Sequence, residues 1–506
     1  MRSRRSKLSQ LRILDAASRP DVEAYKLMRA GRLAEALEFA ERALAGERTC
    51  VRAHGLLATI LLKLGRAGDA ERVVLEALEC APGVADAYDG LAHVSMLLGR
   101  HERSNALYRR VVELAPGIPR FWYNLASSER SFGRLAEAEA ACECAIELDS
   151  TQYPSVLLRS ELRVQTPEAN HVQELRRLLA RPGIEDRARM FLGYALGKEL
   201  DDLARFDEAF PCFADAARTR RRHLAYEVAL DERKMQRIRE AFAEAPAGPA
   251  ARPATGRIDS SRYIFIVGLP RSGTTLVERI LLGLAGVHSN GETDHFSAAL
   301  LAASPAQGGD VFARAAAADP DAVAARYAAL AEGAGAGSGS GKIIEKLPMN
   351  YLYLGAIQRA LPGAKLILLS RSPLDSCFAM YRTLFGEAYP FSYDFEDLAR
   401  YYSAYQGLIG HWRARCGGDI HEVVYEDLVK DPARSGAALA QHCGLAWSAQ
   451  AIEVQNNAAV SLTASAAQIR RPIYGSSSGR WRGYRPHLEP LIQALRSRGV
   501  ALPSDA

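Results

Sequence analysis

Residues 263–284 read YIFIVGLPRSGTTLVERILLGL. The first five form a continuous apolar run, which is typical of a strand buried on both faces. Between this run and the helical stretch VERILLGL, Gly268 and Gly273 allow the backbone amides of a loop to close around an anion. The N-terminus of the following helix adds a partial positive charge. The stretch therefore predicts a strand, a phosphate-binding loop and a helix in succession.

Three further apolar runs cover residues 342–344, 365–369 and 422–424, and helical stretches separate them. Alternation of buried strands with helices is typical of a parallel sheet. The C-terminal half is therefore predicted to be a P-loop-like α/β domain.

The loop departs from that of nucleoside-triphosphate enzymes at one position. Its glycines fit the frame G-x-x-x-x-G-K-[ST], but Thr274 stands in place of the lysine. Those enzymes place the lysine on the β- and γ-phosphates. Here the cation is Arg271, inside the loop, so a kinase or NTPase is disfavoured.

Residues 270–275 read PRSGTT. This run resembles the loop P-[RK]-S-G-T-T of sulfotransferases that use 3′-phosphoadenosine 5′-phosphosulfate (PAPS). The resemblance implies that PAPS is the co-substrate and that Arg271 also stabilises the transition state. No metal is required, because the moving group and the leaving phosphate carry less charge than a triphosphate. The residues it assigns to PAPS are Pro270, Arg271, Ser272, Gly273, Thr274 and Thr275.

A second element that resembles the same family follows the run at 365–369. Ser372, Pro373 and Asp375 are predicted to be the N-cap, N1 and N3 residues of a helix with a capping box. The family's R-x-P element takes the 3′-phosphate, so the resemblance assigns that role to Arg371.

One position departs from the family pattern. Eight residues after this arginine the family usually has a serine that donates to the 3′-phosphate, and here the residue is Ala379. The missing donor is expected to weaken nucleotide binding by about 0.5–1.5 kcal/mol. Compensation by Ser376 or by a C-terminal arginine stays open.

Residues 469–485 read IRRPIYGSSSGRWRGYR, with five arginines and no acidic residue. Interleaved glycine and serine indicate a loop, and a cationic loop of this kind suits a phosphate. The segment resembles the closing segment of bacterial sulfotransferases linked to tetratricopeptide repeats (TPR). That resemblance implies that Ser465 donates to the nucleotide or the sulfuryl group and that Arg480 binds the 3′-phosphate. The alternative is a solvated loop.

Sulfuryl transfer to a hydroxyl needs a base for the acceptor proton. Residues 289–293, SNGET, resemble the Gly-Glu-x-Thr region of protein-tyrosine sulfotransferases, which implies that Glu292 is the base. The match is one residue shorter, and His288 and His295 are competing bases. Lys346, after the run at 342–344, resembles the family lysine that holds the bridging oxygen as charge develops.

The N-terminal half carries a 34-residue repeat. Gly-Arg pairs begin at Gly31, Gly65, Gly99 and Gly133, and a small residue follows each glycine by five positions: Ala36, Ala70, Ser104 and Ala138. Glycine ends a helix where a positive φ is needed, and the small residue lets the next helix approach closely. The pattern resembles TPR helical hairpins.

The repeat continues past residue 150. A fifth repeat is predicted around residues 196–218, where ARFDEA at 204–209 echoes the turn, and residues 152–184 are predicted to be a degenerate repeat. Such a solenoid serves either as a scaffold or dimerisation arm, or as a groove for a protein or peptide.

Composition restricts the other functions. Hydrophobic residues make up 48%, so wholesale disorder and a fibrous protein are excluded. The net charge of +5, from 64 basic and 59 acidic residues, is too balanced to indicate a nucleic-acid binder. There is no apolar run of about 18 residues for a membrane span. The charged N-terminus lacks the apolar core of a secretory signal. Eight cysteines without zinc spacing indicate reduced thiols and no metal site, so we expect a cytoplasmic protein.

We therefore predict an α + α/β chain with a TPR solenoid at 1–225, a helical and Pro-rich linker at 226–260 and a PAPS-dependent sulfotransferase domain at 261–506. The predicted catalytic residues are Glu292, Lys346, Arg271 and Ser465. The acceptor hydroxyl is left open between a peptide tyrosine presented by the TPR groove, a glycan, a lipid and a small phenol. The alternative is a TPR scaffold with a weak or inactive transferase domain, which Ala379 favours. Homo-oligomerisation is also left open.

Overall fold

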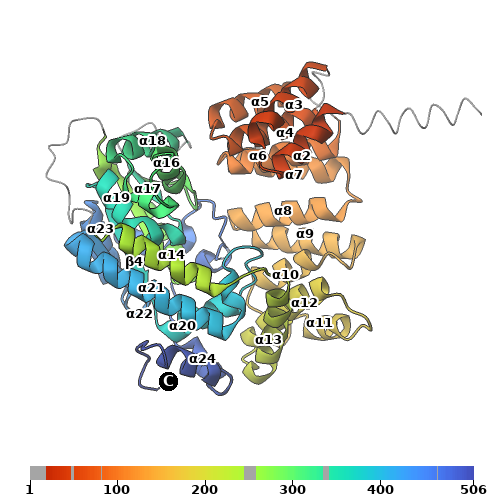
Figure 1. Cartoon of the computed structure of the whole chain (residues 1–506). Helices are drawn as coiled ribbons and strands as arrows, with labels where there is room; N and C mark the ends of the chain where they lie inside the picture. The colour runs from red at the N-terminus through yellow and green to blue at the C-terminus, as the bar shows by residue number, and fades with distance from the viewer. Residues whose placement is uncertain are drawn as a thin grey trace, which may run out of the picture. The chain divides into compact units, whose positions relative to one another are not determined.

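The computed structural model describes residues 19–46, 51–80, 83–243, 258–333, 341–463 and 465–505. Helices dominate both halves of the chain (Figure 1). The chain divides into two compact units. One takes the chain up to Glu129 together with Glu143–Asp149, and the other takes Arg130–Cys142 and everything from Ser150 onward.

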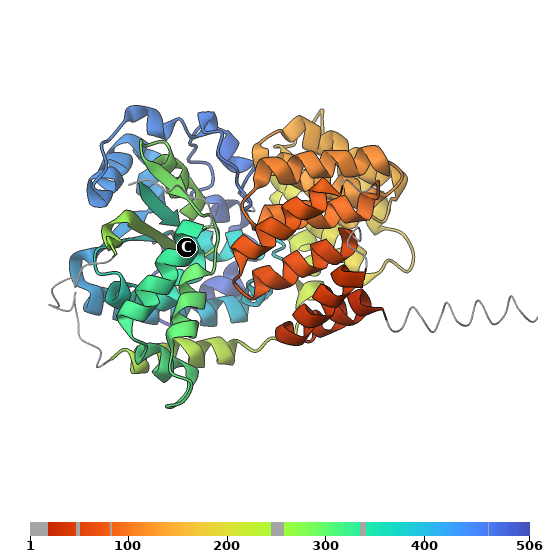
Figure 2. The ribbon, with the colours of Figure 1, turned by 90° about the horizontal axis from the view of Figure 1, so that it is seen from above.

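The helices of the first unit, red to orange, lie side by side in pairs (Figure 1, Figure 2). They are α2 (Pro20–Arg29), α3 (Leu33–Gly46), α4 (Val51–Lys63), α5 (Ala67–Glu79), α6 (Ala85–Leu97), α7 (His101–Leu114), most of α8 (Pro119–Phe132) and the end of α9 (Leu135–Leu148). Three of the predicted turns fall here, and Gly31, Gly65 and Gly99 have φ of +76°, +73° and +72°. At the first of them the Arg32 N–H donates to the Leu27 carbonyl at 2.9 Å, and the same bond recurs at the other two. This is the bond that closes a helix past a left-handed residue, so these predicted turns are confirmed.

The small residues of the repeat are buried. Ala36, Ala70 and Ser104 are at most 2% exposed. The Ser104 hydroxyl donates to the Ala92 carbonyl of the preceding helix at 2.8 Å. A larger side chain at these positions would therefore push the two helices of a hairpin apart.

The helical region continues into the second unit with α10 (Tyr153–Leu162), α11 (Val172–Leu179), α12 (Asp186–Asp202), α13 (Phe206–Arg222) and α14 (Val228–Ala241). The predicted fifth turn is confirmed between α12 and α13. Ala204 takes the place of the glycine with φ +56°, and the Arg205 N–H donates to the Leu200 carbonyl at 2.9 Å. The stretch predicted as a degenerate repeat holds two short helices, α10 and α11, and each packs on α12.

Helix α14 begins the stretch predicted as a linker, and it lies along α21 (Phe395–Cys416) (Figure 1). Phe242, just past its end, meets the Trp412 ring edge-on at 5.7 Å. Arg400 forms an ion pair with Glu232. Residues 244–257 of the predicted linker lie outside the described residues.

A five-stranded parallel sheet organises the rest of the second unit, as predicted. Its strands are β1 (Tyr263–Gly268), β2 (Val287–Ser289), β3 (Lys342–Glu345), β4 (Lys365–Ser370) and β5 (Ile420–Val424), in the order β2-β3-β1-β4-β5. In the central strand Ile264 pairs with Ile344 on β3, and Ile266 pairs with Ile367 on β4. All six residues of β1 are buried, which explains its continuous apolar sequence.

Helices surround this sheet. They are α15 (Thr274–Leu282), α16 (His295–Ala303), α17 (Val311–Ala316), α18 (Pro320–Gly333), α19 (Leu354–Ala360), α20 (Pro373–Tyr381), α21, α22 (Tyr425–Lys430), α23 (Pro432–Cys443) and α24 (Glu489–Arg496). Short 3₁₀ segments lie at Ser260–Arg262, Pro348–Tyr353, Pro390–Tyr393, Gly417–Asp419, Ala449–Ile452, Val454–Asn456, Gln468–Arg470 and Arg480–His487.

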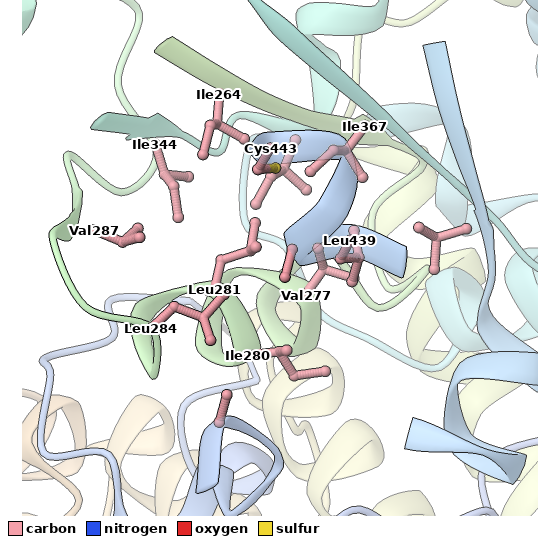
Figure 3. Packing of buried hydrophobic residues seen from close by; sticks show 14 of the residues in the cluster. Ile264, Val277, Ile280, Leu281, Leu284, Val287, Ile344, Ile367, Leu439 and Cys443 are labelled. Carbon is pink, nitrogen blue, oxygen red and sulfur yellow. The ribbon is translucent and has the colours of Figure 1, made fainter. Parts of the chain in front are cut away.

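The hydrophobic core lies between one face of the sheet and helices α15 and α23 (Figure 3). Val277, Ile280 and Leu281 follow helical spacing on α15 and pack on Ile264 and Ile367 of the strands. Leu439 and Cys443 of α23 complete this cluster. The helix after the loop at 269–273 is thereby held firmly against the sheet.

Candidate active site

The elements predicted to bind the nucleotide meet at one edge of the sheet. Because the strands are parallel, their carboxyl ends lie on the same side, where open α/β sheets bind ligands. Strand β1 leads into the loop, β3 into Lys346, β4 into Arg371 and β5 into Tyr425. The fold therefore brings together motifs that lie far apart in the sequence.

A cavity of about 690 Å³ opens within the second unit. Nine predicted site residues line it: Pro270, Arg271, Gly273, Thr274, Thr275, Glu292, Arg371, Ser465 and Arg480. Two others are buried beside it, since Ser272 is 0% and Lys346 1% exposed.

The loop has a backbone that its sequence explains only in part. Gly273 has φ +105°, and a Cβ there would lie 2.5 Å from Cδ2 of the Tyr425 ring. Arg271 is also left-handed, with φ +64°, although it is not glycine. Such strain costs on the order of 1–3 kcal/mol and gathers at ligand sites.

Several polar atoms at the loop are buried without a partner among the described residues. They are Ser272 Oγ, Arg271 Nε and Arg371 Nε. Buried polar atoms are rarely left unpaired in folded proteins. All three can donate a hydrogen bond, so they fit an anionic ligand such as a phosphate or a sulfate.

Arg271 is held by neutral acceptors. Its Nη1 donates to Ser465 Oγ at 2.5 Å and its Nη2 to Gln468 Oε1 at 3.0 Å, and it forms no ion pair among the described residues. Burial, together with the nearby Arg382 and Arg371, lowers the pKa of Arg271 to about 10. The guanidinium therefore stays charged at neutral pH without a carboxylate against it.

Arg371 links three parts of the site. Its Nη1 donates to the Arg271 carbonyl at 2.8 Å, and its Nη2 donates to the Ser477 carbonyl. Its guanidinium lies 4.7 Å from the centroid of the Tyr425 ring. Burial lowers the pKa of Arg371. Arg371 therefore lies between the loop and the C-terminal segment, residues 469–485.

The predicted capping box of helix α20 is wrong. Ser372 is the N-cap and Pro373 opens the helix, but the Ser372 side chain accepts no hydrogen bond from it. The Asp375 carboxylate instead accepts from the backbone amides of Gly479 at 2.6 Å and Trp481 at 3.3 Å. Backbone amides of the C-terminal segment thus bind the Asp375 carboxylate, which in a capping box would accept from the N-cap amide.

The position of the missing serine faces the cavity, since Ala379 lines it. Ser376 does not line the cavity, and its hydroxyl donates to the Arg371 carbonyl at 3.4 Å. Ser376 is therefore not placed to replace the missing hydroxyl.

Glu292 and Lys346 are in direct contact. Lys346 Nζ lies 2.6 Å from Glu292 Oε1 and 3.6 Å from Glu278 Oε2. The Glu292 side chain is 38% exposed, so it can reach both the lysine and the cavity. Neither His288 nor His295 lines the cavity. His288 is exposed on β2, and burial lowers the pKa of His295.

The C-terminal segment forms part of the cavity wall, and its Arg480 also contacts two residues of the helical region. Arg480 Nε donates to Asp201 Oδ1 at 3.1 Å and its Nη2 to the Asp201 carbonyl at 2.6 Å. Its guanidinium also lies 5.0 Å from the centroid of the Phe206 ring. The predicted 3′-phosphate ligand is therefore tied to the C-terminal end of helix α12.

Sequence reasoning missed several residues of the cavity wall, and three of them bear on its chemistry. Asp201 and Arg382 form an ion pair at 2.5 Å, and Tyr389 has a left-handed backbone with φ +52°. Tyr389 and Glu292 both line the cavity, and burial together with the Glu292 carboxylate raises the pKa of Tyr389. The one signal in the sequence is that Arg382 follows Ala379 by three residues, on the same face of a helix.

Among the described residues, no group of three or more His, Cys, Asp or Glu side chains could hold a metal ion. No helix in the described ranges is long and apolar enough to cross a membrane.

Comparison with known families gives three matches. Residues 263–449 match the model of a sulfotransferase family. Residues 27–94 and 91–153 match two tetratricopeptide repeat models. These ranges contain the parallel sheet and the regular helical hairpins respectively.

Three individual proteins that resemble this chain share 28% or less of their sequence with it. An uncharacterized protein of Aquifex aeolicus (strain VF5) is 28% identical over 375 residues, which are 72% of this chain and 48% of that protein. This chain thus spans about half the length of that curated relative. The sulfotransferase domain of the Synechococcus PCC 7002 olefin synthase covers 48% of this chain and 95% of its own, with 20% identity and a TM-score of 0.33. A thermophilic TPR protein of Thermus thermophilus covers 38% and 97%, with 18% identity and a TM-score of 0.26.

Proposed function

In this chain a TPR region precedes a sulfotransferase domain, and we propose that the protein transfers a sulfuryl group from PAPS to an acceptor hydroxyl. One observation carries this proposal. The cavity wall holds Arg271 and Arg371, neither of which has an ion-pair partner among the described residues. Arginine without a carboxylate in a partly dry site favours a phosphate or sulfate ligand.

In this proposal the residues at 270–275 hold the 5′-phosphosulfate. The start of helix α15 presents its free amides to the same place. Arg371 and Arg480 hold the 3′-phosphate. When bound, PAPS supplies the activated sulfuryl group. Arg271 and Ser465, which already share a hydrogen bond, are placed to donate to the group as its charge changes.

Glu292 is the proposed base. Its contact with Lys346 fixes the carboxylate at the cavity wall, where it can take the acceptor proton. An ammonium group has three donors, and Glu292 uses one of those of Lys346. The proposed role of Lys346 is to donate another to the bridging oxygen.

The acceptor end of the cavity is aromatic. Phe385 and Tyr389 line the same cavity as Glu292, and their ring centroids lie 4.9 Å apart. Aromatic side chains beside a base suit a phenol, so a tyrosine side chain of a protein or peptide bound by the TPR region is the proposed acceptor.

We further propose that the TPR solenoid spans residues 1–225, the linker 226–260 and the sulfotransferase domain 261–506. The proposed location of the protein is the cytoplasm.

A TPR scaffold with a weak transferase domain is the second candidate. Ala379 favours it, because this position on the cavity wall has no donor. The two candidates differ in whether the chain turns over PAPS.

The experiment incubates the full chain with radiolabelled PAPS and a panel of tyrosine peptides, a small phenol, a glycan and a lipid. We expect label on at least one hydroxyl. Glu292→Gln should lower kcat roughly 10²- to 10⁴-fold, the usual contribution of a general base. It should leave the binding of 3′-phosphoadenosine 5′-phosphate (PAP) unchanged, because the amide keeps the shape of the carboxylate.

His288→Ala is the matched control and should retain full activity, since His288 lies off the cavity. Loss of activity in the histidine variant with full activity in Glu292→Gln would show that the base is assigned to the wrong residue. Binding of PAP without any turnover would favour the scaffold.

A further inference from the structure

Arg382 is a cation of the cavity that the proposed mechanism does not use. It follows the last residue of helix α20, and its side chain is 21% exposed. Long side chains on a helix point back over the preceding turn. Accordingly its guanidinium lies 5.8 Å from the centroid of the Phe378 ring, next to Ala379 in the chain. Arg382 and Ala379 both line the cavity, and Ala379 supplies no donor there.

A carboxylate from the helical region holds this arginine. Asp201, at the end of α12, accepts from Arg382 Nη1 at 2.5 Å, from Arg480 Nε at 3.1 Å and from the Tyr484 hydroxyl at 2.6 Å. Burial would raise the pKa of Asp201, but Arg382 and Arg480 outweigh burial and lower it. One carboxylate is therefore shared by two guanidinium groups.

Arg382 lies close to other cations as well as to a carboxylate. Burial and then Arg382 lower the pKa of Arg271, and Arg382 is among the groups that lower the pKa of Arg371 after burial. Asp201 raises the pKa of Arg382 itself, although burial opposes this. A guanidinium has five N–H donors, and Asp201 is the one hydrogen-bond partner of the Arg382 side chain among the described residues. Several donors are thus left for a ligand of negative charge.

We propose that Arg382 binds the 3′-phosphate of the nucleotide and that Asp201 is the residue that positions it. This inference rests on the proposed function, in which Arg371 and Arg480 take that phosphate. Arg382 directly follows the helix that begins two residues after Arg371, and it shares the Asp201 carboxylate with Arg480. An arginine would then replace the donor that Ala379 lacks, and helix α12 would contribute to nucleotide affinity.

The test measures the affinity of the full chain for PAP and for adenosine 5′-phosphate, which lacks the 3′-phosphate. Arg382→Gln should weaken PAP binding roughly 10- to 100-fold, the effect of losing a charged hydrogen bond. It should change the affinity for adenosine 5′-phosphate by less than about threefold, because that ligand has no 3′-phosphate for Arg382 to bind. Arg413→Gln is the matched control, since Arg413 pairs with Glu422 away from the cavity.

Asp201→Asn tests the positioning role. It should lower the ratio of the two affinities in the same direction but less than Arg382→Gln, since Arg382 keeps its charge and loses its fixed place. Asp215→Asn, on the neighbouring helix α13, should leave the ratio unchanged. A structural defect alone would weaken both ligands together and leave the ratio as it is.

A variant that restores affinity distinguishes the loss of a ligand contact from misfolding. Adding Ala379→Ser to Arg382→Gln should restore part of the affinity for PAP and none for adenosine 5′-phosphate. Equal weakening of both ligands in Arg382→Gln, or no weakening of PAP, would overturn the inference. No recovery in the double variant would also contradict it. A wild-type chain that binds no PAP would instead contradict the proposed function itself.

Discussion

At the scale of single residues, Gly273 connects the loop to the rest of the site. Its left-handed backbone turns the chain into helix α15, and the Tyr425 ring lies where a side chain would begin. The same ring lies under the Arg371 guanidinium. Because Gly273 has no side chain, the Tyr425 ring can pack against the loop and contact the Arg371 guanidinium.

Gly273→Ala is therefore expected to weaken PAP binding by at least about tenfold, because the Cβ must displace Tyr425 and with it Arg371. Calorimetry on the full chain measures this. Gly286→Ala is the matched control, since Gly286 has φ +73° and open space around its Cβ position. It should share the backbone strain, about 1–2 kcal/mol, and keep PAP affinity. Equal affinity in the two variants would show that the Tyr425 contact is irrelevant.

At the scale of elements, strand β3 carries a buried acid directly before the proposed catalytic lysine. Glu345 is 0% exposed, and burial raises its pKa from an ordinary 4.5 to about 7. Its Oε1 accepts from the Asn350 amide at 3.0 Å. A carboxyl whose pKa is higher in the folded state keeps its proton more tightly there. Folding stability therefore falls as pH rises from about 4.5 to 7, and the cost is fully expressed above pH 7.

Glu345→Gln should remove this cost. Relative to wild type, the variant should gain on the order of 2–3 kcal/mol between pH 5 and pH 8, since each unit of pKa shift corresponds to about 1.4 kcal/mol. Thermal unfolding of both proteins at the two pH values gives the comparison. A difference between variant and wild type that is the same at pH 5 and pH 8 would mean that Glu345 does not titrate in this range.

At the scale of the whole molecule, the sequence predicts what is local and misses what is distant. The turns at Gly31, Gly65 and Gly99 follow from a left-handed residue, and strand β1 follows from its apolar run. The ion pair of Asp201 with Arg382 joins residues 181 apart, and no local pattern marks it. The capping box failed for the same reason, because Gly479 takes Asp375 from 104 residues away.

The roles given to the site residues depend on one claim, that this cavity binds the adenosine nucleotide of a sulfuryl donor. Calorimetric titration of the full chain with PAP tests it most directly, with Arg271→Ala as the variant and Arg413→Ala as the control. We expect micromolar PAP binding that is lost in Arg271→Ala, kept in Arg413→Ala and tighter than the binding of ATP with Mg²⁺. If the chain did not bind PAP, or bound it equally well without the Arg271 side chain, this cavity would not be the nucleotide site.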